Sequence, residues 1–342
     1  MMVNTIILMD ISMLQTIGAP VVIIGGLGLL FGIILAIASK VFHVQIDPRV
    51  EQIIAALPGA NCGACGLPGC AGYADAIVHA DADINKCAPG GTTAVTTIAQ
   101  IMGKEASTQT RKIAVIHCTS GGKQSTNWKY AYQGIETCKS AVNIADGPNS
   151  CSYGCVGYND CVAVCLFDAI TVDEYGMRCI DLEKCTACGA CVKACPRALI
   201  DLVAVDKVVY IKCSSKDKGA IAKPNCGSAH PCIGCGICAK KCPVDAIMIE
   251  NNLAIIDYSK CINCGRCATA CPTKAIQDLL VGMRKKAHII SEACIGCTIC
   301  AKVCPVTAIS GELKQLHTVN DSLCVGCELC VGKCPKHAIE MI

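Results

Sequence analysis

Cysteine is the residue type in this chain whose number and spacing could support chemistry. The 342 residues include 33 cysteines, and five segments follow the pattern C-x2-C-x2-C-x3-C-P. Thiolates at this spacing hold [4Fe–4S] clusters, because three on one tight loop bind three irons of a cubane while the fourth, released by proline, binds a neighbouring cluster. The pattern therefore predicts one-electron carriers in series. The five copies are Cys185, Cys188, Cys191 and Cys195; Cys232, Cys235, Cys238 and Cys242; Cys261, Cys264, Cys267 and Cys271; Cys294, Cys297, Cys300 and Cys304; and Cys324, Cys327, Cys330 and Cys334.

The exchange of the fourth cysteine predicts that the copies work in pairs. Crossed ligation of this kind ties two β-α-β halves together, and it can replace the aromatic core that a chain with 3 Phe and 1 Trp cannot build. We expect the sets Cys232, Cys235, Cys238 with Cys271; Cys261, Cys264, Cys267 with Cys242; Cys294, Cys297, Cys300 with Cys334; and Cys324, Cys327, Cys330 with Cys304.

Four more cysteines lie closer to the N-terminus, at Cys62, Cys65, Cys70 and Cys87. The residues between the first three are small, so backbone N–H groups can approach cluster sulfurs and help to set the reduction potential. We interpret this group as a single [4Fe–4S] site. Zinc on the same four thiols is the alternative.

Outside the copy at Cys185–Cys195, the cysteines between residues 113 and 228 depart from the regular pattern. Cys155, Cys161 and Cys165 form a half motif in which Tyr158 occupies the second ligand position and Leu166 replaces the proline. Six cysteines lie outside every motif: Cys118, Cys138, Cys151, Cys179, Cys213 and Cys226. The one at position 179 lies in an alternating, strand-like run, where we expect a small buried hydrophobe.

Of the other five, one would complete the half motif and four would build an additional cluster. The count then gives eight [4Fe–4S] clusters, or seven if some of the five are structural. The spacing does not decide which thiol goes where.

Disulfides and zinc are the other uses of so many thiols. The N-terminal residues lack a basic region and an A-x-A-like cleavage site, so the thiols are expected in a reducing cytosol, where disulfides are rare. Zinc favours two C-x2-C knuckles separated by a longer loop, unlike the five runs found here. We therefore expect iron only, bound through the cysteines.

No other chemistry is predicted on this chain. A one-electron relay needs no acid–base pair, and histidines such as His117, His230 and His317 are scattered, which favours surface or packing roles. The run from Gly26 to Phe31 lacks the third glycine of a dinucleotide fingerprint. No catalytic residue and no nucleotide site are predicted.

The elements that carry these cysteines begin with a membrane helix. Residues 21–38 are apolar and uncharged, and about 20 such residues cross a hydrocarbon layer of about 30 Å. Pro20 fits the first turn of this helix. Lys40 and Arg49 follow it, which predicts that the cluster domains face the cytoplasm. Gly28 and Gly32 either let another helix approach or reflect the abundance of glycine in membrane helices.

The predicted fold class is α+β, with a single N-terminal transmembrane helix, a small 4Fe-4S domain and three tandem bacterial 2[4Fe-4S] ferredoxin-like units. The expected boundaries are 1–40 for the segment with the helix (about 20–39), 45–92 for the 4Fe-4S domain, 93–112 for a Thr-rich linker, 113–228 for the irregular ferredoxin-like domain, 229–282 for the next and 283–342 for the C-terminal one.

The combination of these features resembles the B subunit of the Rnf complex, the ion-translocating ferredoxin:NAD+ oxidoreductase, in its long clostridial-type form. The resemblance rests on the apolar anchor, the run from Ala60 to Cys70, the run from Cys151 to Ile170 and the serial ferredoxin motifs. It implies a single-pass protein of the cell membrane that exchanges electrons with soluble ferredoxin. It also implies relay to membrane and flavin-bearing partner subunits, which couple the flow to Na+ or H+ transport and to NAD+ reduction; nucleic acid is not an expected partner.

Soluble ferredoxin is usually acidic, so its docking surface should be basic. The candidate groups are Lys216, Lys218 and Lys223; Lys240 and Lys241; and Arg284, Lys285 and Lys286, with ordinary solvated surface as the alternative for each. Two other functions are less consistent with the sequence. The iron–sulfur subunit of a membrane hydrogenase or formate dehydrogenase would normally lack the anchor followed by the Cys62–Cys87 site, and a zinc scaffold would be colourless.

Overall fold

The computed structural model describes residues 2–41, 47–106, 110–121, 127–228 and 230–342, and it describes side chains from Val21 onward. The chain forms two compact units, Met1–Gln52 and Ile53–Ile342. Each is considered by itself.

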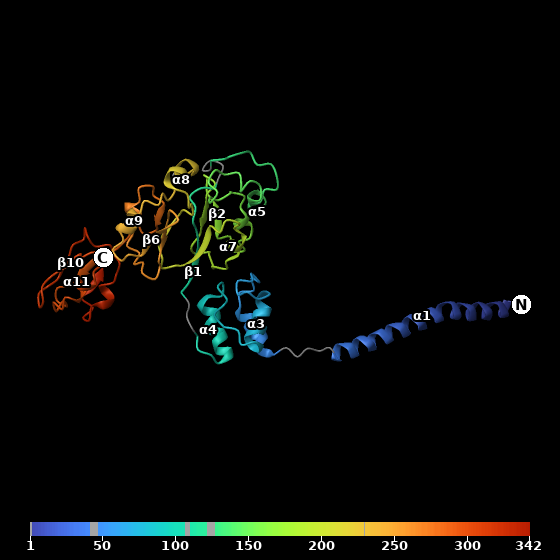
Figure 1. The fold of residues 1–342 in the computed structure, drawn as a ribbon. Helices are drawn as coiled ribbons and strands as arrows, with labels where there is room; N and C mark the ends of the chain where they lie inside the picture. Colours follow the sequence, from blue (N-terminus) through green and yellow to red (C-terminus); the bar gives the residue numbers. More distant parts are fainter. Residues whose placement is uncertain (1, 42–46, 107–109, 122–126, 229) are drawn as a thin grey trace. The chain divides into compact units, whose positions relative to one another are not determined.

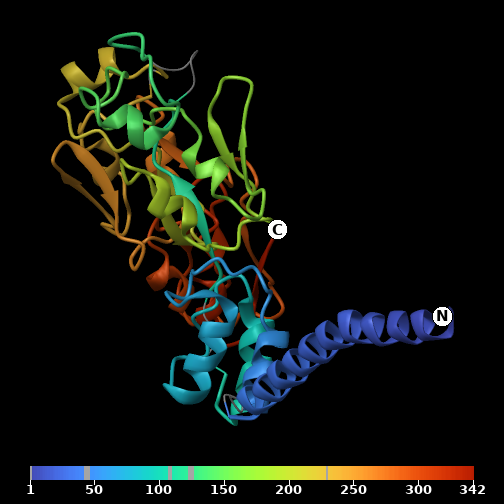
Figure 2. The same cartoon turned by 90° about the vertical axis from the view of Figure 1, so that its right-hand side faces the viewer.

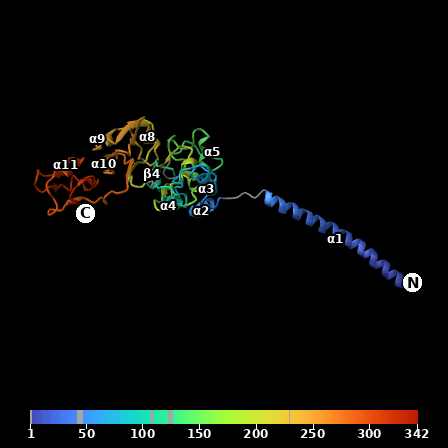
Figure 3. The same ribbon diagram turned by 90° about the horizontal axis from the view of Figure 1, so that it is seen from below.

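The first unit is dominated by one helix, α1 (Met2–Val41), seen as an uninterrupted coil in Figures 1 and 3. Within it, Val21–Val41 is long and apolar enough to cross a membrane, and its large side chains are exposed. These bounds agree with the span expected at about 20–39. Pro20 lies inside α1, so its predicted place in the first turn is wrong; one missing N–H leaves the residues on both sides helical.

Three further helices follow in the sequence: α2 (Pro48–Ala56), α3 (Gly69–His79) and α4 (Gly91–Met102). The last one occupies much of the segment 93–112 that we expected to be a linker, so that expectation is wrong for residues 93–102. Four apolar side chains at helical spacing are buried, and Gly103, in the left-handed conformation, ends the helix. The buried four are Ala94, Val95, Ile98 and Ala99.

Strand pairing divides the remaining chain into three similar segments, 112–204, 209–278 and 287–341, which we call the first, second and third segments. In each, an outer antiparallel pair joins the first and last strands, and an inner hairpin lies between them. The inner hairpins of the first and second segments are visible in Figure 2, in yellow-green and orange. The outer pairs are β1 (Lys112–Ile116) with β4 (Ile200–Ala204), β5 (Val209–Ile211) with β8 (Ile276–Asp278), and β9 (Ala287–Ile289) with β12 (Ile339–Met341). The inner pairs are β2 (Ile170–Val172) with β3 (Arg178–Ile180), β6 (Ile247–Glu250) with β7 (Leu253–Ile256), and β10 (Ile309–Ser310) with β11 (Thr318–Val319).

Short helices follow the cysteine loops. The first segment has α6 (Asp160–Ala163) and α7 (Ala190–Ala194), the second has α9 (Ile237–Lys240) and α10 (Arg266–Ala270), and the third has α11 (Ile299–Val303) and the 3-10 helix η1 (Val331–Lys333). Two more, α5 (Cys138–Val142) and α8 (Gly219–Asn225), lie in insertions that follow β1 and β5. The mixture of helix and strand is that of an α+β chain.

The start of the second segment differs from the expected boundary at 228/229. Strand β5 precedes that boundary, yet it pairs with β8 beyond it, with Ile211 opposite Ile276. The insertion with Cys213 and Cys226 separates this short strand from its cysteine motif, which is why the sequence pattern did not connect them.

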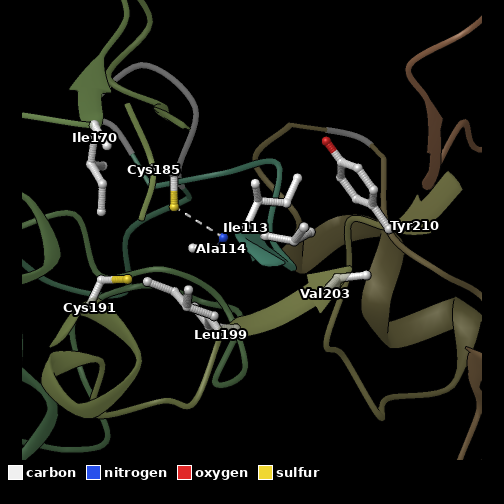
Figure 4. Packing of buried hydrophobic residues seen from close by; sticks show 11 residues of the cluster. Ile113, Ala114, Ile170, Cys185, Cys191, Leu199, Val203 and Tyr210 are labelled. Carbon is white, nitrogen blue, oxygen red and sulfur yellow. Dashed lines mark hydrogen bonds between the residues drawn. The ribbon is translucent and has the colours of Figure 1, made fainter. Parts of the chain in front are cut away.

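Cysteines take part in the cores of all three segments. Figure 4 shows Ile113, Ile170 and Leu199 of the first segment packed with the side chains of Cys185 and Cys191. The buried clusters of the second and third segments likewise contain the third cysteine of each of their motifs. Cysteine side chains thus fill core positions that aromatic side chains occupy in larger domains.

Each cysteine loop bends through two left-handed residues, one before and one after its second ligand position. Around Cys235 these are Gly234 (φ +65°) and Gly236 (φ +72°). The position equivalent to Gly236 in the third segment is Thr298, at φ +66° and without a side-chain capping hydrogen bond. A left-handed residue other than glycine costs about 1–2 kcal/mol.

Replacing Thr298 by glycine should therefore stabilise the third segment by about 1 kcal/mol. The matched change Gly236→Ala should have the opposite sign, because the nearest atom to its new Cβ would be Ile249 Cγ1 at 4.0 Å and only the backbone conformation would be strained. The measurement is the rate at which visible absorption is lost in guanidinium under anaerobic conditions. Equal rates for both variants would contradict this account.

Candidate iron–sulfur sites

The N-terminal cysteines lie together. Burial raises the pKa of the Cys87 thiol, and the neighbouring thiols of Cys70, Cys62 and Cys65 raise it further. Tyr73 positions the loop that leads to Cys87. Its buried hydroxyl donates to the Asp83 carbonyl at 2.7 Å and accepts a hydrogen bond from the Lys86 N–H at 3.0 Å.

The second and third segments gather their thiols in the crossed sets that the spacing predicts. In each set, burial raises the pKa of at least one thiol and other members of the set add to the rise. The sets are Cys238 with Cys232, Cys235 and Cys271; Cys264 and Cys267 with Cys261 and Cys242; Cys330 and Cys327 with Cys324 and Cys304; and Cys300 with Cys294 and Cys297. The last three line one hollow with Cys334.

A repeated turn holds the fourth cysteine of the motifs. The residue three places after it is left-handed, and in five of the six motifs the N–H four places after it donates to the sulfur at 3.2–3.4 Å. Hydrogen bonds to ligand sulfur tune the potential of a cluster. Leu166, which replaces the proline, leaves the turn intact, because Ala169 still donates to Cys165 Sγ at 3.4 Å.

Cys138 lies beside the half motif that is one thiol short. It lines one hollow with Cys155, Cys161 and Cys195. Burial raises the pKa of the Cys161 thiol to about 12, and the thiols of Cys155, Cys138 and Cys195 contribute to the rise. The sequence had left this position open among five cysteines.

Local contacts explain how Cys138 reaches the loop. It opens α5, and the Asp160 carboxylate at the start of α6 accepts the Cys138 N–H at 2.9 Å. Tyr158, at the position of the absent second cysteine, packs instead against Tyr132, with ring centroids 5.4 Å apart. These contacts depend on the tertiary fold, so the spacing could not identify Cys138.

The partner site in the first segment follows the same exchange. One hollow is lined by Cys165, Cys185, Cys188 and Cys191. Ala114 of β1 donates its N–H to Cys185 Sγ at 3.4 Å, the dashed line in Figure 4. Cys165 and Cys195 therefore each lie with thiols from the other loop of this segment.

The last group joins the two insertions. One hollow is lined by Cys118, Cys151, Cys213 and Cys226. Burial raises the pKa of the Cys118 thiol to about 12 and that of Cys213 to about 11. The first two cysteines belong to the first segment, and the other two follow β5 in the second.

A short internal repeat accompanies this group, and the sequence reasoning missed it. The runs 116–120 and 211–215 read I-H-C-T-S and I-K-C-S-S, and each begins at the last residue of an outer strand. In both, the N–H two residues after the cysteine donates to its sulfur at 3.4 Å. The repeat could have paired Cys118 with Cys213.

The prediction that Cys179 is a buried hydrophobe is wrong. Its side chain is exposed on β3, and the neighbouring Arg178 is buried instead. Buried and exposed side chains do alternate along β3, but the buried position is 178 and not 179. The Arg178 guanidinium is held inside because it donates to the carbonyl oxygens of Gly121, Gly157 and Gly176.

These groups fit four-iron clusters by the chemistry of their donors. Among the described side chains, no three His, Cys, Asp or Glu lie close enough to hold a single ion; a cubane does not require this, since each thiolate binds a different iron. Such a cluster, when bound, supplies one-electron redox chemistry, while the chain provides thiolates and N–H donors. Because the thiol pKa values are raised, cluster binding must displace protons.

One of the three candidate basic groups is engaged in internal contacts. The Arg284 guanidinium forms two hydrogen bonds with the buried Asp278 carboxylate, at 2.6 and 2.7 Å, and the Lys286 ammonium donates to the Cys324 carbonyl. Exposed lysines remain in the other two groups: Lys216, Lys218, Lys223, Lys240 and Lys241.

Comparison with protein families agrees with this assignment of chemistry. Models of 4Fe-4S dicluster domains match residues 231–275, 254–310 and 293–339, a 4Fe-4S binding domain matches 178–201, and an Fe-S cluster model matches 57–89. The fold and the sites thus define an iron–sulfur electron-transfer protein with several [4Fe–4S] domains.

Three relatives identify the family, and each is the B subunit of its complex. The chain is 50% identical over 248 residues to that of the Na(+)-translocating ferredoxin:NAD(+) oxidoreductase complex of Acetobacterium woodii, covering 72% of this chain and 74% of that protein. It is 39% identical over 206 residues to that of the ion-translocating oxidoreductase complex of Methanosarcina acetivorans, covering 60% and 78% of the two chains. It is 38% identical over 235 residues to that of the proton-translocating ferredoxin:NAD(+) oxidoreductase complex of Clostridium ljungdahlii, covering 68% and 81%. The chain belongs to the family of Rnf complex B subunits.

Substituting Cys138 tests the repaired half motif. Cys138→Ala should lower the iron content of the anaerobically purified protein by about one iron per chain if a three-iron cluster persists, or by about four if the cluster is lost. Cys179→Ala is the matched control, and it should leave iron and sulfide unchanged. Full iron content in Cys138→Ala would show that another residue completes the site.

Proposed function

We propose that this chain accepts electrons from a soluble ferredoxin and relays them through eight [4Fe–4S] clusters to membrane and flavin-bearing subunits of an ion-translocating ferredoxin:NAD+ oxidoreductase. The observation that carries the proposal is the grouping of the thiols. Of the 33 cysteines, all but Cys179 fall into eight groups of four.

The groups also support a continuous route. Crossed ligation places two sites side by side in each of the three segments, and the group of Cys118 and Cys213 takes thiols from both the first and the second segment. An electron can then pass from one segment to the next without leaving the chain. The N-terminal group and its four thiols would complete the route towards the membrane subunits.

The partners and the location follow from the family and from charge. We propose a single-pass protein of the cell membrane whose cluster domains face the cytoplasm, because Lys40 lies in the last turn of α1 and Arg49 follows it. The names of two relatives assign sodium to one and protons to the other. They therefore favour neither ion for this chain.

Metal analysis tests the number of clusters. Eight clusters require about thirty-two irons and as many sulfides per chain, four of each for every group. Anaerobic iron and sulfide determination on the full-length protein measures both. A value near twenty-eight would reduce the count to seven, and zinc in place of iron would refute the relay.

Charge reversal tests the docking of ferredoxin. The exposed Lys216, Lys218 and Lys223 flank Cys213 and Cys226, and Lys240 and Lys241 flank Cys242. Changing the docking group to glutamate should slow reduction by ferredoxin about tenfold or more at low salt and leave iron content unchanged, since steering of an acidic partner is screened by salt. Stopped-flow reduction measures the rate, and each group serves as the control for the other. Unchanged rates for both would refute basic docking at these surfaces.

A further inference from the structure

We infer that Arg178 raises the reduction potential of the cluster held by Cys138, Cys155, Cys161 and Cys195 above that of its neighbour held by Cys165, Cys185, Cys188 and Cys191. The inference rests on the proposed cluster at the first of these sites. It adds an energetic order to the relay and names the residue that sets it.

The guanidinium lies beside the site. Arg178 lines the same hollow as the four thiols and is 9% exposed. A Cβ built on Gly121 would lie 2.8 Å from Cys155 Sγ and 3.0 Å from Arg178 Nη1, so these two atoms are less than about 6 Å apart. Gly121 and Gly157, both at positive φ, thereby leave room for the guanidinium to approach the sulfur.

The hydrogen-bond acceptors that surround the Arg178 guanidinium in the described part of the chain are neutral. Its Nη1 donates to the carbonyls of Gly121 and Gly176, and its Nε donates to Asn159 Oδ1 at 2.9 Å. Among the described residues, no carboxylate forms an ion pair with it. Neutral acceptors hold the side chain in place and leave its positive charge to act on the site.

The surroundings of Arg178 differ from those of Arg284, and its effect on the thiols can be set against that of Asp160. Arg284 is near Cys264, but its charge is balanced by Asp278 at 2.6 Å. Asp160 lines the same hollow, and its negative charge raises the pKa of the Cys138 thiol. The positive charge of Arg178 has the opposite effect: it lowers the pKa of the Cys138, Cys155 and Cys161 thiols, against the rise that burial causes. The positive charge therefore acts on three of the four ligands.

The sign of the effect follows from electrostatics. Each one-electron reduction adds a negative charge to a cluster that four thiolates already make negative, and no bond or proton need change. A nearby buried cation stabilises the reduced form more than the oxidised form, so the potential rises. Electron transfer from the reduced neighbouring cluster to this site would then be favourable. Within the first segment, the electron would therefore reside mainly on the cluster beside Arg178.

The experiment neutralises the charge without removing its hydrogen bonds. Asn159→Asp places a carboxylate where the amide oxygen now accepts from Arg178, and position 159 is left-handed at φ +65°, a conformation that aspartate tolerates. Redox titration of the full-length protein, followed by electron paramagnetic resonance, should show one midpoint potential lowered. The expected change is about tenfold in the ratio of reduced to oxidised cluster at a fixed potential, or about 59 mV for one electron.

Two further variants separate charge from structure. Arg178→Lys keeps the charge and should stay close to the unsubstituted potential. Arg111→Gln is the matched control, because Arg111 also donates to backbone carbonyls beside a cluster site, those of Leu182 and Glu183, but is exposed and screened by water. It should shift no potential.

Unaltered potentials in Asn159→Asp at full iron content would overturn the inference, as would a fall in Arg178→Lys as large as that in Asn159→Asp. Failure of the proposed cluster at this site would appear differently, as missing iron in the unsubstituted protein.

Discussion

The exchange of one cysteine between neighbouring loops is the constraint on which this structure depends. A fourth thiol that bends away from its own motif must arrive beside three others from a different loop, so each pair of loops is fixed in position by the sites it shares. Only a small apolar core is then needed, and the third cysteine of each motif in the second and third segments is itself part of that core. The outer strand pair closes each segment around this arrangement, which explains how strands of only two to five residues suffice.

Much of this could be predicted from the sequence, because cysteine spacing reports directly on a local loop. The thiols of the four predicted crossed sets lie together, as do those of the N-terminal group. Spacing within a motif does not identify cysteines that distant parts of the chain contribute to a group. Cys138 reaches its site through the contact between α5 and Asp160, and Cys151 and Cys226 meet only because two insertions come together.

The incorrect predictions have physical causes of the same kind. Threonine-rich sequence suggested a linker at 93–112, yet an apolar stripe within it was enough to form α4. The phase of β3 was reversed because an arginine, and not the adjacent Cys179, found buried partners. Strand β5 was assigned to the wrong segment because it pairs with the distant strand β8, and the sequence of a three-residue strand does not indicate its partner.

The turn around Leu166 bears on how proteins of this kind are recognised in genomes. Its left-handed Asp168 and its N–H to sulfur bond are those of the regular motifs, although the proline is absent. Proline therefore favours this turn without being required for it. Pattern searches that insist on proline after the fourth cysteine will undercount redox centres, and those that tolerate an apolar residue there, and a missing second cysteine, will recover sites such as this one.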